Sequence, residues 1–175
     1  MQELEIILDE YRKLISNQNT TETDVHKFMV EKDVFWMFGL EYIRIKSKVR
    51  YPPGKKHYEF DLMLERHDSF CDLVELKGPN ENLFDKRTTR RSKPNEKLSE
   101  AIAQVFTYLY AIDKTSDQNI VKPKAYIVIG NEKTDRPSER RIFSSHLSNI
   151  ELITHSELYS RGLLLLKHIK SKTDN

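Results

Sequence analysis

The sequence contains one cysteine, five glycines and one tryptophan among its 175 residues. The single cysteine, Cys71, cannot form an internal disulfide, so we expect a reducing compartment, the cytoplasm. The few glycines form no glycine-rich phosphate loop, which argues against an ATP-binding or dinucleotide-binding protein. No apolar run approaches the roughly 20 residues that span a bilayer. We therefore expect a protein without membrane contact.

Neither sign of charge is in excess, because 29 basic and 27 acidic residues leave a net charge of +2. This balance excludes a uniformly basic surface, so a nucleic-acid partner would have to be held by a local patch. The six histidines show no metal-ligand spacing, which argues against a zinc site. Hydrophobic residues make up 38% of the chain, which is enough to bury a core.

The periodicity of the hydrophobic residues predicts alternating helices and strands. Helices are expected at 2–17, from near 21–23, and at about 94–114, 137–147 and 156–170. Strands are expected at about 42–49, 57–65, 70–77, 125–129 and 150–153. Short connections make the first three strands an antiparallel meander. We therefore predict a single α/β domain, a mixed sheet flanked by helices, with an N-terminal helix (1–20), a core (21–130) and a C-terminal α-β-α extension (131–175).

The triplet Glu75-Leu76-Lys77 is the only place where an acidic residue precedes a lysine by two positions. Side chains alternate along a strand, so Glu75 and Lys77 share one face. If the preceding hairpin turns about Asp68, Asp61 lies directly opposite Glu75, with β-carbons roughly 5 Å apart. A slip of one residue would turn Asp61 to the other face. The apolar face of the second strand is expected to consist of Phe60, Leu62 and Leu64.

Two carboxylates this close repel each other, and a shared cation relieves the repulsion. Mg²⁺, or the similar Mn²⁺, prefers oxygen ligands, so Asp61 and Glu75 are candidate metal ligands. Lys77 beside the metal could stabilise the attacking water or the charge of a pentavalent phosphate. Two other interpretations stay open. The triplet could belong to an ordinary amphipathic strand, or Lys77 could pair with Glu59, which the same register places opposite it.

The order of elements adds to this motif: an Asp stands on the second of three antiparallel strands, Glu-x-Lys ends the third, and a helix and a strand follow. Further motifs in the same order are Glu22, His26-Lys27-Phe28, Phe35-Trp36-Met37-Phe38-Gly39, Phe60-Asp61, Val74-Glu75-Leu76-Lys77-Gly78-Pro79, Ala101-Ile102-Ala103-Gln104 and Tyr108. The pattern resembles the restriction-endonuclease-like core of PD-(D/E)xK nucleases. More closely, roughly residues 20–130 resemble the nuclease domain of Shedu-type bacterial anti-phage defence proteins. One departure is Phe60, which stands where the name of the motif has proline.

The resemblance implies that Asp61 and Glu75 bind the metal, that Lys77 assists catalysis and that Gln104 faces the site. A helical wheel places Gln104 beside the apolar stripe of its helix, where an ordinary polar residue would also lie. Glu22 is a candidate for the extra acid that many such nucleases carry on the first core helix, and equally a helix-start glutamate favoured by the macrodipole. No additional domain of the kind that many Shedu-type proteins carry is evident, so we expect target sensing to work differently or to lie in a partner.

A cluster of cations follows the strand of Glu75. It consists of Lys86, Arg87, Arg90, Arg91 and Lys93. These side chains suit contacts to the phosphate backbone of DNA beside the cleavage site, and RNA is not excluded. A solvated loop without a binding role is the alternative.

The favoured hypothesis is a Mg²⁺-dependent or Mn²⁺-dependent endonuclease that cuts DNA in anti-phage defence. Two opposed active sites would be needed for double-strand cuts, which a homo-oligomer would supply. The rival hypothesis is a catalytically inactive nucleic-acid-binding or regulatory oligomeric module on the same fold. A structural α/β protein without a nucleic-acid role is the third interpretation.

Overall fold

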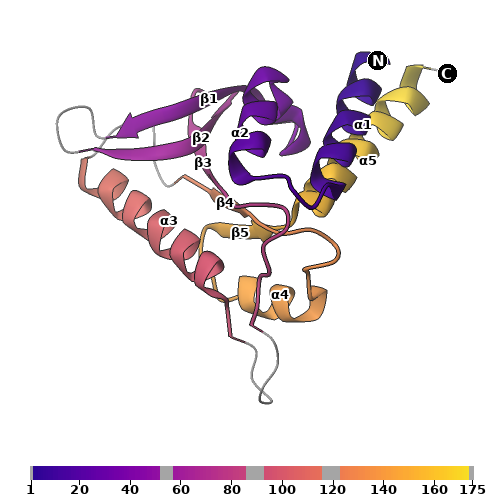
Figure 1. The fold of residues 1–175 in the computed structure, drawn as a ribbon. Helices are drawn as coiled ribbons and strands as arrows, with labels where there is room; N and C mark the ends of the chain where they lie inside the picture. The colour runs from indigo at the N-terminus through magenta and orange to yellow at the C-terminus, as the bar shows by residue number, and fades with distance from the viewer. Residues whose placement is uncertain (1, 52–56, 86–92, 116–122, 174–175) are drawn as a thin grey trace.

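The computed structural model describes residues 2–51, 57–85, 93–115 and 123–173. Its elements, shown in Figure 1, are α1 (Gln2–Ser16), α2 (Glu22–Glu31), the 3-10 helix η1 (Val34–Met37), β1 (Tyr42–Tyr51), β2 (Tyr58–Arg66), β3 (Cys71–Leu76), α3 (Glu96–Thr115), β4 (Ala125–Val128), α4 (Pro137–Ser144), β5 (Ile150–Ile153) and α5 (His155–Thr173). The helices and strands predicted from the hydrophobic periodicity are therefore confirmed. Among the described helices, none is long and apolar enough to cross a membrane.

The strands form one five-stranded mixed sheet in the order β1-β2-β3-β4-β5. The first three strands pair antiparallel, as predicted for the meander. The next two pairs, β3 with β4 and β4 with β5, are parallel. The chain reaches β4 from β3 through α3, because parallel neighbours need a crossover connection. The carboxyl ends of β3, β4 and β5 consequently meet at one edge of the sheet.

Helices cover both faces of the sheet (Figure 1). On one face, α1, α2, η1 and α5 pack in a single hydrophobic cluster with strand residues such as Leu62, Val74 and Val128. On the other face, α3 packs in a second cluster with Leu73 and Ile127. The strands β3 and β4 are buried on both faces, as their continuous apolar character requires. The fold is thus a sheet between two helical layers.

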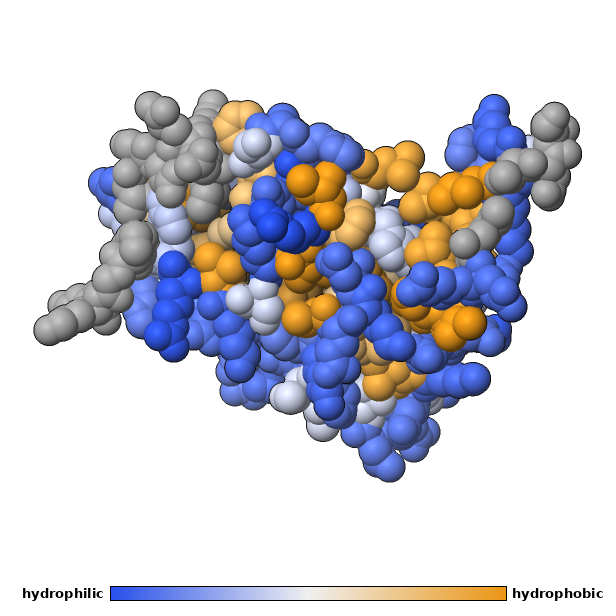
Figure 2. All heavy atoms as spheres, turned by 90° about the horizontal axis from the view of Figure 1, so that it is seen from above, coloured by the Kyte–Doolittle hydropathy of each residue, from blue (hydrophilic) through white to orange (hydrophobic). Residues whose placement is uncertain are grey.

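The face seen in Figure 2 mixes hydrophilic and hydrophobic side chains, and the hydrophobic ones appear at its centre and on its right-hand side, where α1 and α5 lie. Ile6 of α1 and Leu164 of α5 contribute to the exposed hydrophobic area of these two helices. The helices lie side by side in Figure 1, so the N-terminal end of α1 neighbours the C-terminal end of α5. Both ends of the described chain are therefore fixed to the same layer.

The predicted register between β2 and β3 is confirmed. The hairpin turns about Asp68, where the Arg66 N–H donates to the Phe70 carbonyl at 2.8 Å. The ladder runs from the pair Glu65–Cys71 to the pair Leu62–Val74. The next position along both strands brings Asp61 to Glu75, as the turn position required.

The expectation that Phe60, Leu62 and Leu64 share one face is wrong. Leu62 and Leu64 pack in the cluster beneath α1 and α5. Phe60 packs in the cluster beneath α3, with its ring 4.8 Å from the Tyr108 ring. In β1, Lys48 lies between the partners of Leu62 and Phe60 and has a left-handed backbone, with φ of 49°. This conformation interrupts the alternation of the hairpin at the level of Asp61.

Candidate active site

Glu75 and Lys77 stand at the carboxyl edge of the sheet, where β3 ends. Both side chains are buried, with exposed fractions of 2% for Glu75 and 7% for Lys77. The Lys77 Nζ lies 2.6 Å from the Glu75 Oε1 and 3.8 Å from the Glu22 Oε2. Lys77 is held at the sheet because its backbone N–H donates to the Val128 carbonyl of β4 at 2.9 Å. The ion pair therefore sits on backbone that is still part of the parallel ladder.

Asp61 is fixed on both its side chain and its main chain. Its Oδ2 accepts a hydrogen bond from the Leu76 N–H at 2.8 Å. Its carbonyl lies 3.1 Å from the Nε2 of His26, which comes from α2. The same nitrogen is 3.1 Å from the Ser47 Oγ. These contacts orient Asp61 at the place where β2 and β3 stop pairing, beside Glu75.

Burial and neighbouring charges set the protonation of the site. Burial raises the pKa of Glu75 to about 7, the Asp61 carboxylate adds to this shift, and Lys77 opposes it. Burial lowers the pKa of Lys77, but its hydrogen bond to Glu75 and the nearby carboxylates outweigh burial, so this pKa lies above its usual range. Burial also raises the pKa of Glu22. The site thus concentrates negative charge around one ammonium group, an arrangement that favours a cation.

One oxygen of the Glu75 carboxylate, Oε2, is buried and accepts no hydrogen bond of good geometry from any described residue. The Tyr108 side chain lies close enough to interact with this carboxyl group, and that interaction raises the pKa of Tyr108. A buried carboxylate oxygen without a donor is costly, and a hard cation would remove that cost. Asp61 and Glu75 therefore fit Mg²⁺ or Mn²⁺ as a pair of oxygen ligands. Within the described ranges, no three His, Cys, Asp or Glu side chains form a cluster that could hold a metal ion.

The start of α2 explains why Glu22 reaches the site. Thr21 caps the helix, since its Oγ1 accepts from the Asp24 N–H and the Asp24 Oδ2 accepts from the Thr21 N–H at 2.9 Å. This capping box fixes the backbone at the start of α2, and with it the direction in which the side chain of Glu22, the first helical residue, projects. Glu22 is thus both a helix-start glutamate and a neighbour of Lys77.

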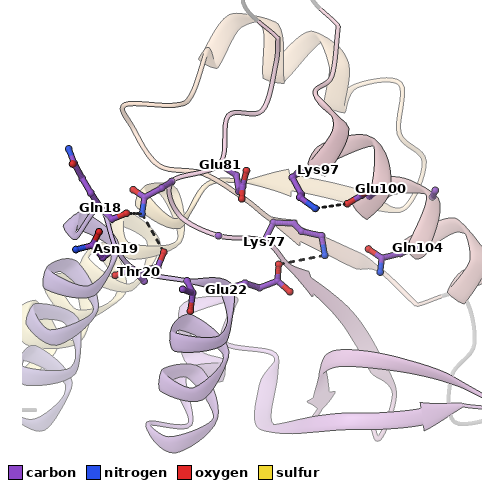
Figure 3. A pocket seen from close by; sticks show the side chains of 13 residues that line it. Gln18, Asn19, Thr20, Glu22, Lys77, Glu81, Lys97, Glu100 and Gln104 are labelled. Atoms are coloured by element: carbon purple, nitrogen blue, oxygen red, sulfur yellow. Dashed lines mark hydrogen bonds and ion pairs between the residues drawn. The ribbon is translucent and has the colours of Figure 1, made fainter.

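An open pocket of about 790 Å³ lies in front of Lys77. It is lined by Gln18, Asn19, Thr20, Thr21, Glu22, Lys77, Gly78, Asn80, Glu81, Lys97, Glu100, Ala103 and Gln104. Figure 3 shows Gln104 extending from α3 toward the Lys77 ammonium group, with Glu22 on the opposite side. Lys97, on the rim, is 3.0 Å from Glu100 and does not join the Lys77 ion pair. Gln104 therefore faces the site, although its side chain is exposed to solvent.

Glu59, the alternative ion-pair partner predicted for Lys77, pairs with another residue. Glu59 lies 3.1 Å from the Nε of Arg50 across the β1–β2 hairpin, and its side chain is half exposed. Lys77 instead contacts the two carboxylates of Glu75 and Glu22. The interpretation of Lys77 as the partner of Glu59 is therefore wrong.

The predicted basic cluster falls mostly outside the described residues. Four of its residues lie outside the described ranges: Lys86, Arg87, Arg90 and Arg91. Lys93 is described and exposed. The two ends of this segment are joined, because the Asp85 N–H donates to the Lys93 carbonyl at 3.0 Å and Phe84 bridges to Pro94. The described residues on either side of 86–92 therefore lie side by side, between the pocket residue Glu81 and the start of α3.

Sequence reasoning did not assign a role to three residues at the site. His26 holds the Asp61 carbonyl, as described above. Tyr108 lies near Glu75 and Asp61, and burial followed by their charges raises its pKa. His155, at the start of α5, holds the carbonyl of Lys77 at 2.7 Å. His26 and Tyr108 belong to the motifs that carried the family resemblance, whereas no local signal marks His155.

Fold and site together define an α/β protein with a buried carboxylate–lysine site at the carboxyl edge of a mixed sheet. The chain belongs to the family described as Shedu protein SduA, C-terminal, whose profile matches residues 19–159. The match includes Asp61, Glu75, Lys77 and Gln104, and the predicted resemblance to Shedu is confirmed. A comparison with curated proteins gives no match.

Proposed function

We propose that this protein is a metal-dependent endonuclease with a restriction-endonuclease-like PD-(D/E)xK core, acting on DNA in anti-phage defence. One observation carries the proposal. The buried Glu75 holds Lys77 with one oxygen, keeps the other oxygen without a hydrogen bond of good geometry in the described structure, and stands next to Asp61. A merely structural ion pair would have no reason to place a second, partly buried carboxylate beside the first.

Each residue of the site would have its own role in cleavage. Asp61 and Glu75 would hold Mg²⁺ or Mn²⁺, with Glu22 as the additional acid. The bound ion would lower the pKa of a water molecule and neutralise charge on the phosphate. Lys77, kept protonated by its carboxylate neighbours, would stabilise the negative charge that develops on the phosphate. Gln104 would orient the substrate across the pocket, since it points toward Lys77 from α3 (Figure 3).

The substrate and setting follow from the family and from charge. Family membership supports a role in anti-phage defence, and DNA is the proposed substrate, with RNA as the other nucleic acid to test. The phosphate backbone would be contacted by the basic cluster, which consists of Lys86, Arg87, Arg90, Arg91 and the exposed Lys93. A single cysteine agrees with a cytoplasmic protein. A homo-oligomer would bring two such sites to opposite strands.

The test is cleavage of supercoiled and linear DNA with Mg²⁺, Mn²⁺ or EDTA. Wild type is compared with Lys77→Ala and with Lys97→Ala, a matched control from the same pocket whose partner is Glu100. We expect cleavage that depends on the metal, disappears in Lys77→Ala and persists in Lys97→Ala. Metal-dependent cleavage that survives in Lys77→Ala would remove Lys77 from the mechanism.

The rival function is a nucleic-acid-binding module that does not cut. The basic cluster supports it, because binding needs no metal. Replacing Arg90 and Arg91 by alanine separates the two functions. A nuclease should weaken mainly in substrate affinity and still cut at high DNA concentration, whereas a binding module should lose its main activity. DNA binding without cleavage in any metal would favour the rival.

A further inference from the structure

A fully buried histidine connects the candidate active site to both terminal helices. His155 opens α5 and has no exposed surface. Its Nε2 lies 2.7 Å from the Lys77 carbonyl oxygen, and its Nδ1 lies 2.8 Å from the hydroxyl of Tyr11. Tyr11 comes from α1 and is also fully buried. The three residues are far apart in sequence, and the contacts run in series from α1 through α5 to the end of β3.

The chemistry of the partners fixes the direction of both hydrogen bonds. A carbonyl can only accept, so the Nε2 of His155 must carry the hydrogen. The neutral ring then has a lone pair on Nδ1, to which the Tyr11 hydroxyl donates. Burial lowers the pKa of His155 to about 4, which keeps the ring neutral near pH 7. Tyr11 therefore selects the tautomer of His155 that can hold Lys77.

The parallel ladder shows why Lys77 needs this partner. The Lys77 N–H donates to the Val128 carbonyl, so in a continuing parallel ladder the Lys77 carbonyl would accept from the N–H of Gly130, just beyond the end of β4. The Gly130 N–H is instead directed to the Gly78 carbonyl at 3.1 Å. Gly130 can make this turn because its φ is 69°. The carbonyl of Lys77 is thereby released from the sheet, and the His155 ring takes the place of the missing donor.

His155 is itself anchored to the same strand end. Its backbone N–H donates to the Gly130 carbonyl at 2.9 Å. The ring of His155 thus holds Lys77, the residue after β3, and its main chain holds Gly130, which lies just beyond β4. Because a peptide group is planar, fixing the Lys77 carbonyl also fixes the path of the chain into the pocket residue Gly78.

We propose that Tyr11 and His155 are positioning residues that hold the Lys77 peptide so that its ammonium group stays against Glu75. The inference rests on the proposed nuclease function for its catalytic meaning. Neither residue touches the reacting atoms. Tyr11 lies outside the residues matched by the family profile, so α1 contributes to the site from beyond the matched region.

The test compares Tyr11→Phe with Tyr42→Phe. Tyr42 is an equally buried tyrosine of the same hydrophobic cluster, whose hydroxyl donates to Asp72 at 2.8 Å, away from Lys77. Both variants lose one buried hydroxyl, so both should lose thermal stability. Single-turnover cleavage well below the unfolding temperature should fall about five-fold in Tyr11→Phe, the effect of one net hydrogen bond, and stay near wild type in Tyr42→Phe.

A second comparison keeps or removes the donor to Lys77. The amide of His155→Gln can donate to the carbonyl, whereas His155→Leu cannot. We expect His155→Gln to keep more cleavage activity than His155→Leu. The outcome that would overturn the proposal is equal activity loss in Tyr11→Phe and Tyr42→Phe, or a His155→Leu protein as active as wild type. If His155→Leu does not fold, the tyrosine pair alone decides.

A readout without cleavage separates this inference from the nuclease proposal. Competitive acetylation of lysines, followed by mass spectrometry, measures how often the Lys77 amine escapes its ion pair, with Lys97 as internal reference. Tyr11→Phe should raise the relative reactivity of Lys77 about five-fold, and Tyr42→Phe should leave it unchanged. Should the wild type fail to cut any substrate, the nuclease proposal falls, and this measurement still supports or overturns the positioning of Lys77. Unchanged Lys77 reactivity in Tyr11→Phe would overturn it.

Discussion

The carboxylate of Asp61 accepts a hydrogen bond from the backbone N–H of Leu76 at 2.8 Å, just beyond the last pair of the β2–β3 ladder. In a continuing antiparallel ladder this N–H would bond to the main chain of β2. A side chain has taken that place, so the sheet opens beside Glu75. The end of the ladder leaves Glu75 without a main-chain partner strand on this side, while the Leu76 N–H keeps an acceptor.

Two substitutions at Asp61 separate this structural role from the catalytic one. Asp61→Asn keeps an oxygen that can accept from Leu76, whereas Asp61→Ala leaves the N–H unpaired. Both should abolish cleavage, because both remove a charged ligand. In urea denaturation without metal, Asp61→Asn should stay close to wild type and Asp61→Ala should lose about 1–3 kcal/mol. Equal stability of the two variants would contradict the role of the Leu76 hydrogen bond.

Binding of the metal should release a proton from Glu75. Its pKa is raised to about 7 by burial and by Asp61, so the carboxyl is about half protonated at pH 7 in the metal-free protein. A cation must displace that proton, and its apparent affinity should rise as the pH passes through 7. Calorimetric titration with Mg²⁺ or Mn²⁺ in buffers of different ionisation enthalpy should show release of about half a proton at pH 7.

The control for this titration is the same experiment at pH 8.5. There Glu75 is ionised before the metal arrives, so proton release should be close to zero. Release that does not change between the two pH values would assign the proton to another group. Glu75→Gln should lose both the release and most of the affinity.

His26 should matter for activity through Asp61. Its Nε2 lies 3.1 Å from the Asp61 carbonyl and from the Ser47 hydroxyl, and the bond to a carbonyl requires a hydrogen on Nε2. His26→Ala should lower the cleavage rate about five-fold, as expected for one lost hydrogen bond. Ser47→Ala, which keeps the bond to Asp61, should have a smaller effect. A larger loss of rate in Ser47→Ala than in His26→Ala would argue against an effect of His26 through the Asp61 carbonyl.

His155 should make stability depend on pH below neutrality. Burial places its folded pKa at about 4, below the value of about 6.5 expected in the unfolded chain. Its stabilising contribution is therefore complete above pH 6.5 and is lost as the pH falls toward 4, by up to about 3 kcal/mol. Denaturant unfolding of wild type and His155→Gln between pH 4 and 7 should show this loss only in the wild type.

Glu75 acts in the opposite direction and is present in both proteins of that comparison. Its folded pKa is raised, so its contribution to stability is complete below about pH 4.5 and is lost as the pH rises through 7. Because Glu75 contributes equally to both proteins, its contribution drops out when the stability of His155→Gln is subtracted from that of the wild type. If the two proteins show the same pH dependence, His155 is not buried in the neutral form.

Local patterns were sufficient for much of the fold and for the pairing of the two carboxylates. The hairpin from β2 to β3 has a short turn about Asp68, and a short turn fixes the register of the residues that flank it. With the turn placed at Asp68, Asp61 and Glu75 were expected opposite each other, and the ladder extended by one position agrees. Alternation failed at Phe60, because the left-handed backbone at Lys48 lies on the neighbouring strand and no pattern within β2 indicates it.

The sequence by itself determined the order of helices and strands. It also indicated the β2–β3 register, once the turn is placed at Asp68, and the candidate carboxylate–lysine set, because each depends on residues close together in the chain. The tertiary structure alone decided what holds that set in place. The Asp61 carbonyl is held by a histidine of α2, and the Lys77 carbonyl is held by a histidine of α5 whose ring accepts from a tyrosine of α1. Such partners are separated by tens of residues to more than a hundred, and only the packing of the helices on the sheet brings a buried donor to a buried acceptor.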